Sequence, residues 1–140
     1  MNKPGSVPGL FVTGLTVIAC TVQPSVDDRM VTPLASAGDP ARGREVFVSR
    51  ESGHCVICHE APGVDAFGNV GPSLAGAGAR LTVPQLRLRV ADITMVSPNA
   101  TMPTFHRVEG MTRVESQYQG KPALTGQQVE DVVAWLATLQ

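Results

Sequence analysis

The stretch Cys55-Val56-Ile57-Cys58-His59 decides the fold of this chain. Two cysteines separated by two residues lie on one helical turn, so both sulfurs can form thioether bonds to the vinyl groups along one side of a haem. The histidine directly after them then projects toward the iron and supplies its proximal nitrogen ligand. The spacing therefore predicts one covalently bound haem, attached to Cys55 and Cys58 and ligated by His59.

Two other kinds of site share the Cys-x-x-Cys spacing. A thioredoxin-like dithiol needs a strand–helix–strand context, which the sequence does not show. Half of a zinc site needs a second cysteine or histidine pair at a suitable spacing, whereas Cys20, His54 and His106 are isolated. Both alternatives are weaker than haem.

The sixth ligand of the iron must come from further along the chain. Met102 lies in a loop between Pro98 and Pro103, well separated from His59 and suited to crossing the far face of the haem. A methionine there raises the reduction potential relative to bis-histidine ligation. The other candidates are Met95, which we expect to be core filler, and Met111 and His106, which remain open.

The segment Gly71-Pro72-Ser73-Leu74 suits a supporting role for His59. The carbonyl of Pro72 can accept the second ring N–H of His59 and so fix the tautomer and orientation of that ligand. Gly71 would allow the backbone to approach closely.

The composition predicts one small, loop-rich domain. The chain has 140 residues, 43% of them hydrophobic, with 14 Gly and 11 Pro but only four Phe, one Tyr and one Trp. Its 11 basic and 12 acidic residues leave a formal charge of −1, so no basic excess favours a nucleic-acid partner.

Helix signals predict an all-α domain of about four short helices. The first begins at Asp39-Pro40 and carries Val46 and Phe47 inward, and a second begins near Thr82. In that second helix Leu86, Val90 and Ile93 share one side, and Arg87 and Arg89 should face solvent. The last helix has the capping-box pair Thr125 and Gln128, followed by apolar residues at helical spacing, namely Val129, Val132, Val133, Leu136 and Leu139.

The N-terminus predicts export. An apolar run from Leu10 to Ala19 is too short to span a bilayer and has the length of a secretory signal core. We therefore divide the chain into a signal peptide (1–19), a linker (20–38) and the domain (39–140). Cys20 ends a lipobox-like sequence and would be a lipid anchor, and Ala35-Ser36-Ala37 is the competing cleavage site.

Taken together, these features resemble a class I cytochrome c. They are a first helix carrying Gly43 and Phe47, the Cys55–His59 motif, the Gly71–Leu74 turn, a Met-Pro loop and a last helix bearing Trp135. In that fold the first and last helices cross, which would bring Phe47 near Trp135.

Within that class, residues 39–140 resemble the SoxX family, the monohaem subunit of the sulfur-oxidising cytochrome SoxXA. The resemblance rests on GNVGPSL at 68–74, TMP at 101–103 and YQGKPALT at 118–125, followed by QVEDVVAWL at 128–136. The last two strings are much narrower signals than the haem motif.

The resemblance implies an electron-transfer role. SoxA would join thiosulfate oxidatively to a cysteine of the carrier protein SoxY, and this periplasmic subunit would pass the released electrons to a small cytochrome c. The chain itself would have no catalytic residue; Cys55, Cys58, His59 and Met102 carry over as haem attachment sites and ligands. The alternatives are a stand-alone mobile carrier and a lipid-anchored cytochrome of another respiratory enzyme. Mobile carriers usually show a charged docking patch, and the balanced charge favours the SoxX interpretation.

Overall fold

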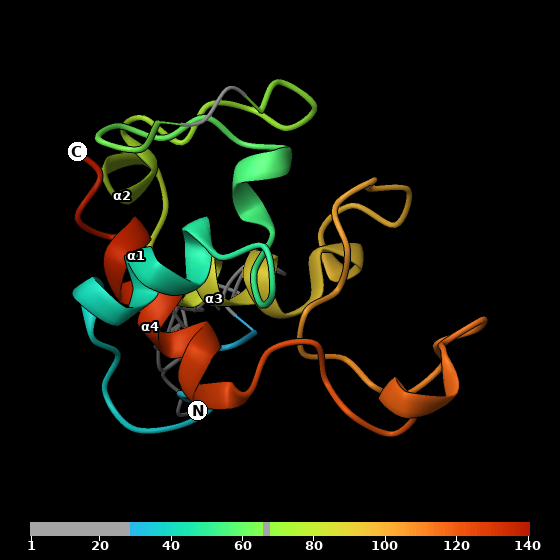
Figure 1. Cartoon of the computed structure of the whole chain (residues 1–140). Coiled ribbons are helices and arrows are strands. Elements are labelled where there is room, and N and C mark those ends of the chain that lie inside the picture. Colours follow the sequence, from blue (N-terminus) through green and yellow to red (C-terminus); the bar gives the residue numbers. More distant parts are fainter. Residues whose placement is uncertain (1–28, 66–67) are drawn as a thin grey trace, which may run out of the picture.

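The computed structural model describes residues 29–65 and 68–140 of the chain (Figure 1). Its first helix, α1 (Pro40–Val48), begins where the sequence predicts. The Asp39 carboxylate accepts hydrogen bonds from the backbone N–H groups of Ala41 (2.8 Å) and Arg42 (3.0 Å), and Pro40 occupies the first turn, where its missing N–H has no consequence. The helix buries Gly43 and Phe47.

The last helix, α4 (Gly126–Leu136), crosses α1, as the resemblance to class I cytochromes implies. Its capping box between Thr125 and Gln128 is present. The crossing is close because a Cβ atom on Gly43 would lie only 1.9 Å from the backbone oxygen of Asp131. Beside it the rings of Phe47 and Trp135 pack with their centroids 4.6 Å apart. Leu139 lies beyond the end of the helix but is still buried.

Of two further helices, α3 (Val83–Asp92) packs along α4 and α2 (Ala77–Arg80) contacts the residues that follow α4. The one-turn helix α2, which the sequence does not predict, precedes α3. The helix α3 begins where the sequence predicts, and Thr82 forms a capping box with Gln85. Leu86 and Val90 are buried as expected.

The prediction that Arg87 faces solvent is wrong. Arg87 is only 3% exposed, because its guanidinium forms an ion pair with the buried Glu130 of α4. The spacing of the apolar residues predicts one buried side of α3, the side of Leu86 and Val90. The side that carries Arg87 is also covered, by α4 and by the backbone of Met30. Arg89, in contrast, is half-buried.

Met95 also differs from its prediction as core filler. It ends a short 3-10 helix (Ile93–Met95) that follows α3, and its side chain is 41% exposed. The chain turns outward at this point, so the apolar stretch reaches the surface. Two other 3-10 helices, Cys55–Ile57 and Ser116–Tyr118, complete the regular structure of the described residues, which contain no strand.

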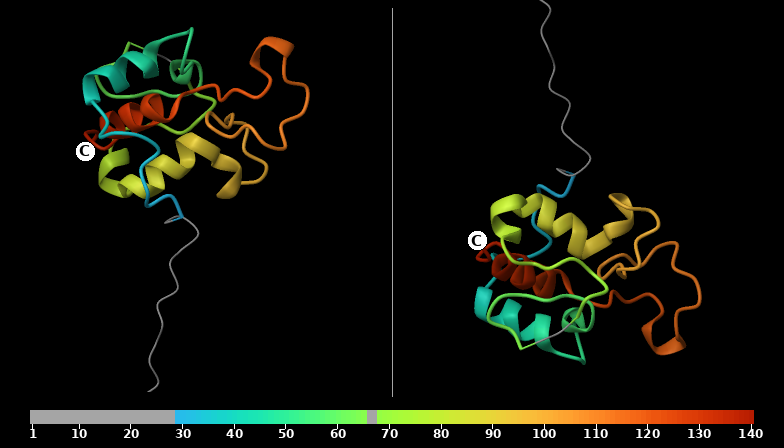
Figure 2. Two further views of the ribbon diagram at one scale, coloured as in Figure 1. Left: turned by 90° about the horizontal axis from the view of Figure 1, so that it is seen from below. Right: turned by 90° about the horizontal axis from the view of Figure 1, so that it is seen from above.

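Two irregular segments frame the helices (Figures 1 and 2). Residues 30–38, here called the strap, run along α3 and α4, and Met30 and Leu34 pack against the core. Residues 107–123, here called the arm, project away from the helices on the side of the haem motif. The predicted signal core and Cys20 lie outside the described residues. None of the helices in the described part of the chain is both long and apolar enough to span a bilayer.

Candidate haem site

A single large cavity brings together all five of the predicted site residues. It has a volume of about 1300 Å³ and is lined by Cys55, Cys58, His59, Pro72 and Met102. Small-molecule pockets usually measure about 300–1,000 Å³, so this cavity suits a larger group. Much of the remaining wall is apolar, formed by Phe47, Leu74, Leu86, Val90, Ile93, Val132 and Leu136. A large apolar cavity with two thiols and an imidazole on its wall fits a covalently attached haem.

The haem motif is held in a tight turn beside the end of α1. His54 adopts a left-handed conformation (φ 54°) and leads into the 3-10 helix Cys55–Ile57. The N–H of His59 then donates to the carbonyl of Cys55 (2.9 Å), and the N–H of Cys58 donates to the same oxygen (3.1 Å). Gly53 is needed before the turn, since a Cβ atom there would lie 2.4 Å from the Val46 oxygen. The turn places both sulfurs and the imidazole on the cavity wall.

The backbone around Pro72 fixes the His59 ring. His59 Nδ1 lies 2.8 Å from the carbonyl oxygen of Pro72, and the N–H of Gly71 donates to the Cys58 carbonyl (2.8 Å). A Cβ atom on Gly71 would lie 2.4 Å from His59 Cε1, so glycine allows this approach. With Nδ1 donating to Pro72, the Nε2 atom is the one left to bind a metal.

The pKa of the Cys55 thiol argues against a redox dithiol. Burial raises its pKa to about 12. Dithiol oxidoreductases need a thiolate near neutral pH and therefore lower the pKa of their reactive cysteine. Among the described residues, no group of three or more His, Cys, Asp and Glu side chains could hold a metal ion.

The structure separates the four candidates for the distal ligand. Met102 and Met111 both line the cavity, whereas His106 and Met95 do not. His106 Nδ1 instead lies 2.9 Å from the carbonyl oxygen of Leu124. Met102 packs against the core, while Met111 lies on the arm, is 41% exposed and accepts a hydrogen bond at its sulfur from Thr104 Oγ1 (3.5 Å).

The sequence analysis missed a set of basic side chains on the cavity wall. Four line it against one acidic side chain, Glu51, and they are Arg80, Arg89, Arg107 and Lys121. Cationic groups suit the propionate carboxylates of a haem. The whole-chain charge of −1 hides this local excess, because the four come from separate segments and acidic residues elsewhere balance them.

Comparison with known proteins agrees with this geometry. The family model for cytochrome c matches residues 40–140. The chain is similar to a chain of the crystal structure of SoxXA from P. pantotrophus, with 38% sequence identity and a TM-score of 0.68. That match covers 75% of this chain and 84% of the other. No curated protein matches the chain.

Proposed function

This chain belongs to the cytochrome c family as a SoxX-like member, and from that premise we propose that it is the electron-transfer subunit of a SoxXA complex. Proteins of this kind bind haem c covalently, and Cys55 and Cys58 fit the attachment motif. The observation that carries the proposal is the large cavity that holds this motif and Met102 on its wall, in a chain 38% identical to part of a SoxXA complex.

We assign each residue of the site one task. Cys55 and Cys58 form the thioether bonds, and His59 presents Nε2 to the iron while Pro72 holds Nδ1. Met102 supplies the distal ligand, since it is the core-packed methionine of the two that line the cavity. When bound, haem supplies a one-electron carrier whose potential the methionine raises.

The proposed partner reaction sets the direction of electron flow. SoxA joins the terminal sulfur of thiosulfate to a cysteine thiol of SoxY, which forms a sulfur–sulfur bond and releases one proton and two electrons. The haem of this chain takes the electrons one at a time and passes them to a small cytochrome c. No nucleophile or general base is assigned to this chain, because its two described cysteines are used for attachment. This electron transfer takes place in the periplasm, after the chain has been exported.

A stand-alone mobile carrier is the second candidate. The four basic side chains on the cavity wall favour it, because mobile cytochromes dock through charged patches near the haem. Some of these groups would be neutralised by the haem propionates, which weakens the patch.

The test is the native mass of the haem protein, purified gently from its own host grown on thiosulfate. We expect a heterodimer whose larger chain also carries haem. The His59→Ala variant, purified in the same way, is the control. It should lose the normal haem spectrum, which shows which part of the absorbance comes from the haem of this chain. Elution at the mass of one polypeptide and one haem would overturn the subunit proposal and leave the mobile carrier.

A further inference from the structure

The strap (residues 30–38) has no helix or strand but is fastened to the helices by buried polar groups. The most important of these groups are Arg87 of α3 and Glu130 of α4, which form an ion pair and are 3% and 5% exposed. The pair is bidentate, with Arg87 Nε and Nη2 donating to the two Glu130 oxygens at 2.7 and 2.9 Å. Such a pair is stable in the interior only when its remaining donors and acceptors are also satisfied.

The strap supplies those remaining partners. The third guanidinium nitrogen, Arg87 Nη1, donates to the backbone oxygen of Met30 (2.6 Å). Glu130 Oε1 accepts a second hydrogen bond from the backbone N–H of Leu34 (2.8 Å). The strap therefore completes both halves of the ion pair through its backbone, whatever its side chains.

The C-terminal end of the strap is fitted equally closely. A Cβ atom on Gly38 would lie 2.0 Å from the Glu130 backbone oxygen, so the strap touches α4 itself at this point. The next backbone N–H, that of Asp39, donates to the buried carboxylate of Asp131 (2.8 Å). The side chain of Gln127 also donates to the carbonyls of Ser36 and Ala37, at 3.4 and 3.5 Å.

The helix α3 connects these contacts to the haem cavity, because it carries both Arg87 and part of the cavity wall. Leu86, Arg89 and Val90 of this helix line the cavity, and Arg87 leaves the helix on the side that faces the strap and α4. The ion pair therefore joins the outer side of one cavity wall to α4.

We propose that the strap is a positioning element of the mature protein, retained after export, that holds α3 against the haem through Arg87 and Glu130. Cleavage after Ala37 would remove the Met30 oxygen and the Leu34 N–H together and leave a buried ion pair short of two partners. Ala35-Ser36-Ala37 is thus part of the folded domain, and any leader is removed upstream of Met30. This inference does not depend on which partner the cytochrome serves.

The first test is the intact mass of the mature holoprotein from its own host. We expect a mass that includes Met30 to Ala37 and one haem. A chain that starts at Gly38 would overturn the proposal. An unprocessed chain would retain the strap and so support the proposal, while contradicting the predicted removal of a signal peptide.

The second test separates positioning from charge. Arg87→Met should lower Tm by about 10 °C or more, whereas the matched control Arg50→Met, at an exposed arginine, should not. If α3 is displaced, Arg87→Met and Glu130→Gln should shift the haem reduction potential in the same direction. A purely electrostatic effect would shift it in opposite directions, because one variant removes a positive and the other a negative charge.

If Arg87→Met does not accumulate as folded protein, Arg87→Lys replaces it in the comparison. Arg87→Lys keeps the charge but loses the bidentate geometry, so it should lower Tm and shift the haem reduction potential in the same direction as Glu130→Gln. The positioning role is overturned if the Arg87 variants match Arg50→Met in Tm, or if the potentials of Arg87→Met and Glu130→Gln move in opposite directions.

Discussion

The strap and the arm are both largely irregular segments, but the strap is held to the helices through its backbone and the arm through a few side chains. The strap satisfies two buried charges with its backbone, and Gly38 lies against α4. The arm bonds mainly to itself, as when Gln119 donates to the Val114 carbonyl (3.3 Å) and Lys121 to the Gln117 carbonyl (3.3 Å). An irregular segment is therefore held in place when buried polar side chains of the helices use its backbone N–H and C=O groups as hydrogen-bond partners.

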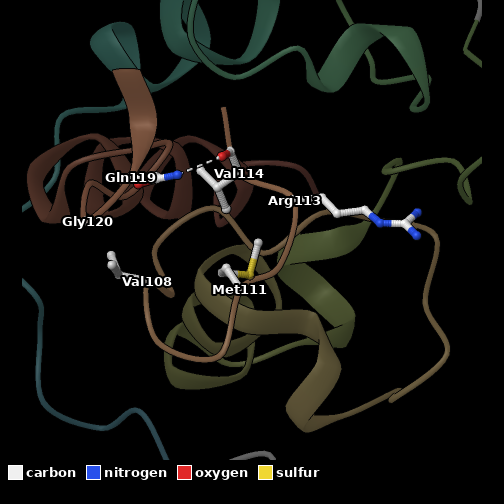
Figure 3. Close-up of a pocket in the computed structure, with 6 residues that line it drawn as sticks. All are labelled: Val108, Met111, Arg113, Val114, Gln119 and Gly120. Carbon is white, nitrogen blue, oxygen red and sulfur yellow. Dashed lines mark hydrogen bonds between the residues drawn. The ribbon is translucent and has the colours of Figure 1, made fainter. Parts of the chain in front are cut away.

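The arm also carries apolar side chains that line the haem cavity and are only partly covered by protein. Val108, Met111 and Tyr118 are 36%, 41% and 57% exposed. The arm encloses a small cavity of about 370 Å³, and Figure 3 shows the six residues that line it, with the Gln119 side chain donating to the Val114 carbonyl. In contacts with residues outside the arm, Arg107 Nη1 lies 3.3 Å from the Asp92 carboxylate and donates to Thr94 Oγ1 (2.9 Å), and the Met111 sulfur accepts a hydrogen bond from Thr104 Oγ1. Few buried contacts and exposed backbone mark a region of low local stability.

The largest expected effect separates the two methionines that face the haem cavity. Met102→Ala should remove the distal ligand, lower the reduction potential and destabilise the protein by about 3 kcal/mol, because Met102 also packs against the core. Met111→Ala, on the arm, should leave the potential unchanged. The measurement is redox titration together with the absorption band of ferric iron bound to a thioether. Persistence of that band in Met102→Ala and its loss in Met111→Ala would reverse the assignment.

A pair of glycine substitutions compares the segments directly. Gly38→Ala would place a methyl group 2.0 Å from a backbone oxygen of α4, and should reduce the free energy of unfolding by about 3 kcal/mol. Gly110→Ala, on the arm and away from the haem cavity, would meet no protein atom within 4 Å and would add only the strain of its positive φ (71°), about 1 kcal/mol. Guanidinium unfolding of the two holoproteins gives both values. Equal losses would mean that the strap is no better packed than the arm.

Local signals in the sequence predict most of the helical frame. The caps at Asp39, Thr82 and Thr125 each depend on residues within one turn, and all three are present. The haem motif is equally local. The buried position of Arg87 could not be read from periodicity, because it depends on Glu130 and on the backbone of the strap, which is 57 residues away at Met30.

The lining of the cavity shows the same limit. The sequence favours Met102 over Met111 because Met102 lies in a loop between two prolines, but it does not show that Met102 packs against the core while Met111 lies on the arm. The basic wall is assembled from segments that are remote in the chain, so a charge count averages it away.

Acid should weaken the C-terminal end of the strap through Asp131, which accepts a hydrogen bond from the backbone N–H of Asp39. The Arg42 guanidinium, which donates to Asp131 at 2.9 Å, lowers the pKa of that carboxyl to about 2. Because this folded-state pKa lies below the unfolded value of about 3.9, Asp131 stabilises the fold above about pH 5 and loses that contribution as pH falls toward about 2. Tm measured between pH 6 and 2.5 should therefore fall less steeply in Asp131→Asn than in the natural protein. Parallel curves would show that Asp131 is not linked to folding.

The smallest effect is expected at the tip of the arm. Tyr118 is 57% exposed, ends the 3-10 helix Ser116–Tyr118 and lines the haem cavity, so Tyr118→Ala removes only part of one contact and should change the free energy of unfolding by less than about 1 kcal/mol. The matched variant on the strap is Leu34→Ala, which should cost about 1–2 kcal/mol because Leu34 packs against the core. Both are measured by guanidinium unfolding of the isolated holoprotein. A loss above about 1 kcal/mol for Tyr118→Ala would show that the arm packs on the domain more firmly than its exposure indicates, and the contrast between the two segments would then reduce to the Arg87–Glu130 pair.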